Sequence, residues 1–194
     1  MVQIVLIRPG STDFDAQGRI QGTLDIPLSE QGSAEVSLVV QQLRDLKLEA
    51  VYASSCQAAW ETATALAEGL DLKLKKLDKM QNLDHGLWQG MLVEDVRRKQ
   101  PKVYRQWQEQ PENVCPPEGE MLSQARARVQ QAIAKLVKKH KSGTIGLVVP
   151  EPLASVVHSY LAQCELGDLW KSGCGCGRWE VISFEPQSVA PASS

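Results

Sequence analysis

The residues best suited to chemistry in this chain are its cysteines, a pair of aspartates and the polar residues that follow buried strands. Two thiols flank a single glycine at Cys174 and Cys176, an arrangement that could bind a soft metal or respond to oxidation. Zinc sites usually need four ligands, with two to four residues between paired cysteines, and no second pair is visible. We therefore expect residues 173–177 to form a glycine-rich loop and keep the two cysteines as weak metal-ligand candidates.

Side chains that attack phosphorus in known classes of phosphatase lack, in this sequence, the neighbouring residues that those classes need. Cysteine-dependent phosphatases carry an arginine at a fixed spacing after the cysteine, and none of the five cysteines has one. Asp13 and Asp15 imitate the paired aspartates of haloacid-dehalogenase-type phosphatases, but a loop separates them from the preceding apolar run. Ser54 and Ser55 have no evident base, and serines in such places more often cap helices or line loops.

Alternating strands and helices must position these side chains. Apolar and β-branched runs predict strands at 2–7, 48–53, 72–77, 145–149 and 179–184. Apolar positions at helical spacing predict helices from residue 29 to about 46, at 57–68, over much of 91–110 with a break at Pro101, at 120–140 and at 153–163. This order predicts an α/β fold with three α/β/α layers and a mostly parallel central sheet. Ligands then bind beyond the carboxyl ends of the strands, after Ile7, Ala53 and Val149.

Segments at these places resemble the signatures of the histidine phosphatase (phosphoglycerate mutase-like) superfamily. The matching segments are 5–12 (VLIRPGST), 18–22 (GRIQG), 27–32 (PLSEQG), 51–55 (VYASS), 61–63 (ETA), 83–90 (LDHGLWQG), 116–120 (PPEGE) and 146–149 (GLVV). They keep the family's order and spacing from residue 2 to about 184. The resemblance implies one phosphoglycerate mutase-like domain over residues 1–185, followed by a tail at 186–194 that we expect to be disordered.

The family's chemistry assigns a role to each position of the resemblance. A histidine takes up the phosphoryl group, arginines and a second histidine bind its oxygens, and a carboxylic acid protonates the leaving oxygen. Of this constellation Arg8 remains, with Thr12 beside it. The replaced positions are Pro9 (nucleophile), Ala58 (second arginine), Asn82 (general acid) and Glu151 (second histidine).

Four replacements in four segments predict a catalytically inactive protein, a pseudoenzyme that binds an unidentified protein partner or a non-phosphate small ligand. The candidate ligand-binding residues are Arg8, Thr12, Asp15 and Glu151. Glu151 would repel a phosphate dianion near Arg8, so we expect weak phosphate binding. Arg8 either contacts a ligand or holds loop carbonyls or Asp15, and Trp60, near Ala58, could fill and seal the emptied pocket.

Two alternatives stay open. One is a divergent phosphatase or phosphomutase with a rebuilt active site that uses Arg8, Glu151 and a cysteine. The other is a metal- or redox-responsive protein that uses Cys174 and Cys176. No cofactor is implied by any of the motifs.

Composition limits the partners and the setting. The formal net charge of -2 gives no support to nucleic-acid binding. No apolar run approaches the roughly 20 residues of a membrane-spanning helix, and residues 1–7 are too short for a secretory signal. An odd count of five cysteines favours reduced thiols, so we expect a cytoplasmic protein without membrane contact. Many relatives in the family are dimers, so a homodimer is possible.

Overall fold

A twisted five-stranded sheet with helices on both faces forms the described part of the protein. The computed structural model describes residues 1–77, 79–170 and 175–184. Its strands are β1 (Val2–Ile7), β2 (Ala50–Ala53), β3 (Lys73–Lys76), β4 (Gly143–Val148) and β5 (Trp179–Phe184). They lie in the order β3-β2-β4-β1-β5, and every neighbouring pair is parallel except β1 with β5. The predicted three-layer α/β fold with a mostly parallel sheet is confirmed.

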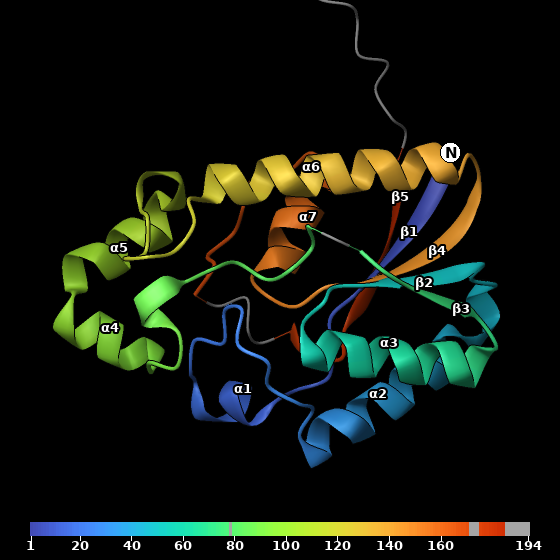
Figure 1. Ribbon diagram of the computed structural model, residues 1–194, viewed down its shortest axis with the longest axis horizontal. Helices are drawn as coiled ribbons and strands as arrows, with labels where there is room; N and C mark the ends of the chain where they lie inside the picture. The colour runs from blue at the N-terminus through green and yellow to red at the C-terminus, as the bar shows by residue number, and fades with distance from the viewer. Residues whose placement is uncertain (78, 171–174, 185–194) are drawn as a thin grey trace, which may run out of the picture.

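Helices lie on both faces of the sheet and beside it (Figure 1). They are α1 (Asp13–Gln17), α2 (Glu30–Leu43), α3 (Gln57–Leu70), α4 (Val93–Lys99), α5 (Pro101–Glu109), α6 (Leu122–Lys139) and α7 (Leu153–Ala162), with short 3₁₀ turns at Arg44–Leu46, Gly86–Trp88 and Pro111–Asn113. Helices α4 and α5 are the ones that lie beside the sheet, at the left of the view. One core lies between the sheet and α6 and α7 and contains Ile4 and Leu6. The other lies beneath α2 and α3 and contains Val5 and Ile7. Because β1 is buried on both faces, its sequence is a continuous apolar run rather than an alternation.

Most element bounds lie within a few residues of the predicted ones, and one helix was not predicted. Residues 13–17, expected to lie in a loop, form α1, which buries none of its residues and so leaves no apolar periodicity in the sequence. Thr12 starts this helix: its Oγ1 accepts a hydrogen bond from the Asp15 amide, and Asp15 accepts one from the Thr12 amide in return. The predicted tail at 186–194 lies outside the described residues.

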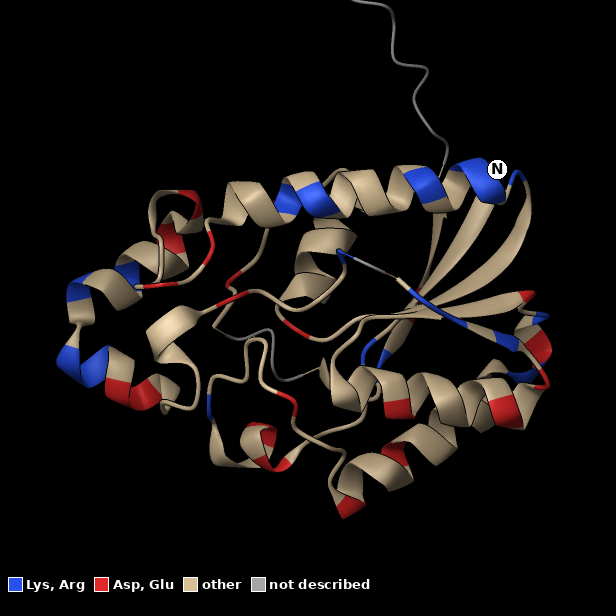
Figure 2. Ribbon diagram, in the orientation of Figure 1, with Lys and Arg blue, Asp and Glu red and all other residues tan. Residues whose placement is uncertain are grey.

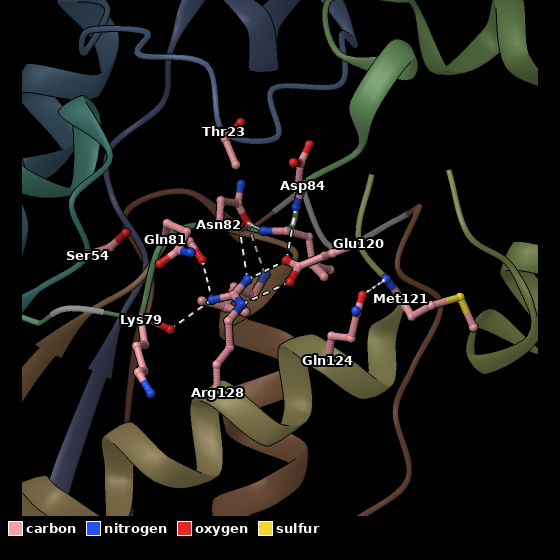
Figure 3. Close-up of polar contacts among 12 residues, drawn as sticks. Thr23, Ser54, Lys79, Gln81, Asn82, Asp84, Glu120, Met121, Gln124 and Arg128 are labelled. Carbon is pink, nitrogen blue, oxygen red and sulfur yellow. Dashed lines mark hydrogen bonds and ion pairs between the residues drawn. The ribbon is translucent and has the colours of Figure 1, made fainter. Parts of the chain in front are cut away.

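Arg128 of α6 fixes the segment that follows β3 (Figure 3). Its Nε and Nη2 donate to the two carboxylate oxygens of Glu120, at 3.0 and 2.5 Å. The other bonds go to main-chain carbonyls: Nη1 donates to Lys79 and Gln81, and Nη2 donates to Asn82. One guanidinium therefore uses its planar set of donors to hold a stretch of chain that has no regular structure of its own.

Asn82 then connects this segment to the loop that follows β4. Its Nδ2 donates to the main-chain carbonyl of Glu151 at 2.7 Å, and its Oδ1 accepts from the amides of Leu83 and Leu153. Asn82 is completely buried. An amide meets these demands because it donates and accepts at once, whereas an ionised carboxylate can only accept. The side chain at position 82 thus sets where Glu151 lies.

We predict that Arg128→Ala lowers the free energy of unfolding by about 3 kcal/mol, because it leaves Glu120 and three carbonyls without their donor in a largely buried place. Urea unfolding followed by circular dichroism measures this. The matched control is Arg97→Ala, which removes an exposed ion pair with Glu94 and should cost less than about 0.5 kcal/mol. Equal effects in the two variants would show that Arg128 is not a structural anchor.

Candidate functional site

The candidate site lies where the loops after β1 and β4 diverge. These strands are parallel neighbours at the centre of the sheet, yet β1 leads to α1 and α2 on one side and β4 leads to α7 on the other. A crevice at such a switch point is the common ligand site of open α/β sheets. Close packing narrows the crevice at Gly10, where a Cβ atom would collide with the carbonyl of Gly32 at the start of α2.

The structure brings most of the predicted site residues together in one cavity of about 30 Å³ at this place. Its lining includes Arg8, Pro9, Thr12, Asp15, Ala58, Glu151 and Cys176. Asn82 is the exception among the replaced positions, because it is buried and is not among the lining residues, although it donates to the main-chain carbonyl of Glu151. Positions far apart in the sequence therefore meet at one cavity.

Arg8 contacts two carboxylates. Its Nε donates to Glu151 Oε1 at 2.6 Å, and its Nη1 donates to Glu180 Oε1 at 2.9 Å. Burial disfavours the charged guanidinium, but the hydrogen bonds and charges of Glu151 and Glu180 outweigh it and raise the pKa of Arg8 above its ordinary value. Arg8 therefore stays charged. The sequence suggested loop carbonyls or Asp15 as its partners, whereas the structure gives it these two carboxylates.

Glu180 contacts Arg8 but is not among the residues that line this cavity, and the sequence motifs do not reveal it. It lies on β5, where the antiparallel register places it opposite Leu6. Only this register brings a residue 172 positions away in sequence against Arg8, and no local motif signals it. Its other oxygen, Oε2, lies 3.2 Å from Nε2 of His158 on α7. The loop after β4 and strand β5 thus each place a carboxylate on one arginine.

Among the remaining candidate residues, Thr12 and Asp15 form hydrogen bonds with each other. Thr12 is almost fully buried and donates its hydroxyl to Asp15 Oδ2 at 2.7 Å, so both residues serve the start of α1. Cys174 lies outside the described residues. Burial, reinforced by the charges of Asp15 and Glu35, raises the pKa of the Cys176 thiol to about 12. Among the described residues no group of three His, Cys, Asp or Glu side chains is arranged to hold a metal ion.

A second cavity, of about 90 Å³, adjoins the first and shares Asp15, Gln21 and Glu151 with it. Arg19, His85 and Trp170 complete its polar and aromatic lining. The predicted seal of the site by a tryptophan is wrong: Trp60 lines neither of these cavities and is 38% exposed on the outer side of α3. Acidic residues occur in several loops around this end of the sheet, while lysines and arginines gather on α6, β3 and the α4–α5 segment (Figure 2).

His85 is buried. Its ring lies 5.6 Å from that of Trp107, and its Nδ1 has no hydrogen-bond partner within the described part of the chain. Burial lowers the pKa of His85 to about 4, so the ring is neutral at pH 7.

This burial predicts a pH-dependent stability. Below pH 6.5 the unfolded chain binds a proton at His85, but the folded chain does not until about pH 4. The free energy of unfolding should therefore fall as the pH drops from 6.5 to 4, by up to about 3 kcal/mol from this group. Urea unfolding of the wild type and of His85→Gln at several pH values measures the difference, and the variant should show the flatter dependence. Parallel pH profiles would contradict the assignment.

Known proteins are similar to this one along most of the chain. Phosphoserine phosphatase 1 of Hydrogenobacter thermophilus is 33% identical over 95% of the chain and 88% of its own length. A metal-independent phosphoserine phosphatase of Arabidopsis thaliana is 26% identical over 84% of the chain and 70% of its length. The solved structure of a mycobacterial glucosyl-3-phosphoglycerate phosphatase matches 93% of the chain and 90% of its own with a TM-score of 0.83 at 23% identity, a likeness of fold.

These relatives correct the prediction of a catalytically inactive protein. Both phosphoserine phosphatases are named for an activity, and the first of them matches the chain almost from end to end. The replacements that the resemblance implies at Pro9, Ala58, Asn82 and Glu151 concern one chemical route. They do not exclude phosphatase activity as a whole.

No helix in the described ranges is long and apolar enough to cross a membrane.

The family model of the histidine phosphatase superfamily (branch 1) matches residues 4–192. The α/β fold with its mostly parallel sheet agrees with this match. The chain belongs to the histidine phosphatase superfamily.

Proposed function

We propose that this chain is a divergent phosphatase that hydrolyses small phosphomonoesters in a rebuilt active site. The observation that carries the proposal is the match to a phosphoserine phosphatase over 95% of the chain. Arg8 supports it, because the guanidinium that would bind phosphoryl oxygens remains in a cavity at the expected end of the sheet.

The rebuilt site differs from the family pattern in its nucleophile. Proline has no side-chain nitrogen that could attack phosphorus, so Pro9 excludes a phosphohistidine at this position. Cys176 lines the cavity, but with a pKa of about 12 its thiol is protonated at neutral pH and is a poor nucleophile. We therefore assign the attack to a water molecule. Hydrolysis is favoured over a mutase reaction, in which a side chain would have to carry the phosphoryl group.

Arg8 and Glu151 would share the work of this step. Arg8 binds the phosphoryl oxygens and stabilises the charge that they carry in the transition state. Glu151, which lines both cavities, takes a proton from the attacking water while the bond between phosphorus and the ester oxygen breaks. The leaving alkoxide takes up a proton from solvent, and the products are the alcohol and inorganic phosphate.

We predict turnover of an aryl phosphate and of phosphoserine by the wild type, and a loss of about 100-fold in kcat/KM for Arg8→Ala. Glu151→Gln should lower kcat more than it changes KM, because it removes the base and keeps the shape of the side chain. Phosphate release and absorbance assays measure both. Glu94→Gln, on the exposed face of α4, is the matched control and should leave the activity unchanged.

The proposal fails if the purified wild type shows no turnover above Arg8→Ala with any of these esters. Contamination by another phosphatase would give turnover that survives Arg8→Ala, and this outcome would also count against the proposal.

The charge of the joined cavities predicts which ester is preferred. Arg8 and Arg19 face Asp15 and Glu151, and Glu180 adds a further negative charge beside Arg8. A substrate that brings its own ammonium group suits this excess of negative charge. We expect kcat/KM to be about tenfold higher for phosphoserine than for 3-phosphoglycerate, which carries a hydroxyl in place of the ammonium. An equal or reversed preference would contradict this prediction.

A further inference from the structure

The two carboxylates that hold Arg8 are fixed to different degrees. Glu151 is 10% exposed, and its second oxygen, Oε2, accepts hydrogen bonds from the amide and the hydroxyl of Ser155 in the first turn of α7. These contacts include a main-chain donor, and the helix start also favours a negative charge. Glu151 is therefore part of the framework of the site.

Glu180 is held less firmly. Its side chain is 33% exposed, and the contacts that the structure gives it are to side chains, Arg8 at 2.9 Å and His158 at 3.2 Å. It lies on β5, an outer strand of the sheet, so that solvent lies next to its carboxylate. The Glu180 side chain can therefore rotate away from Arg8 without breaking any main-chain hydrogen bond that the structure records for it.

The two contacts also use different parts of the guanidinium. Glu151 occupies Nε, and Glu180 occupies Nη1. An incoming phosphoryl group needs a pair of donors on Arg8, because the strong contacts between guanidinium and phosphate are bidentate. With Glu151 fixed on Nε, the donors at the other end of the guanidinium become accessible to an anion when Glu180 leaves.

We propose that Glu180 is an internal competitor that occupies Arg8 in the absence of ligand and sets the affinity of the site for phosphate. The inference rests on the proposed function in one respect, the role of Arg8 as the phosphate-binding residue. Phosphate and the Glu180 carboxylate bind Arg8 in turn. The affinity of the wild type is accordingly reduced by the stability of the Arg8–Glu180 pair.

Isothermal titration calorimetry with inorganic phosphate at low ionic strength tests this. Glu180→Gln, which keeps the size of the side chain and removes its charge, should bind phosphate about tenfold more tightly than the wild type. Glu180→Ser serves as a second substitution and should show the same direction. Glu94→Gln removes one negative charge from the exposed surface of α4 and should bind like the wild type.

A double-mutant cycle separates competition for Arg8 from a general change of charge. In an Arg8→Ala background, Glu180→Gln should alter phosphate binding by less than about twofold. A gain that persists without Arg8 overturns the proposal, as does equal binding by Glu180→Gln and the wild type, or undetectable binding by both. Tighter binding without turnover of any phosphoester would sustain the role of Glu180 and reject the phosphatase. Turnover without tighter binding would sustain the phosphatase and reject the role of Glu180.

Discussion

The pairing of Arg8 with Glu151 is the interaction on which the candidate site depends. A guanidinium at the end of a central strand is largely withdrawn from water, and a charge in such a place needs a partner of opposite sign. Glu151 supplies this partner from the loop after β4, so the ion pair ties the ends of two neighbouring parallel strands across the crevice between them. Glu151, which by the resemblance stands at a histidine position of the family, is thus the counter-ion of Arg8.

Asn82 and Arg128 make that pairing possible. The carbonyl of Glu151 is held by the Asn82 amide, and the Asn82 segment is held by Arg128. An ionised acid at position 82 could not donate to this carbonyl, whereas asparagine donates to it and accepts from two amides at once. The replacements at 82 and 151 are therefore linked through one hydrogen bond.

The sequence predicts the fold better than it predicts the contacts within the site. Continuous apolar runs and helical spacing place the strands and the long helices, because burial acts on these patterns directly. The short helix at 13–17 leaves no such pattern, because it buries nothing and depends on the local cap at Thr12. Glu180 carries no signal either, because its contact with Arg8 follows from the antiparallel register of the last strand. The exposed position of Trp60 depends on the rotational phase of α3, which neighbouring residues do not fix.

The four replaced positions suggest the wrong conclusion about activity for a related reason. Each position has its family role in a single mechanism, and a residue unfit for that role says nothing about other routes to the same products. A phosphomonoester needs an anion-binding group, an attacking oxygen and a base, and these can be arranged in more than one way on one fold. Arg8, which lies between two carboxylates, is the group that would meet the first requirement. If Glu180 competes for Arg8 as we propose, the function of this site depends less on which family residues are missing than on how readily Arg8 exchanges Glu180 for a phosphoryl group.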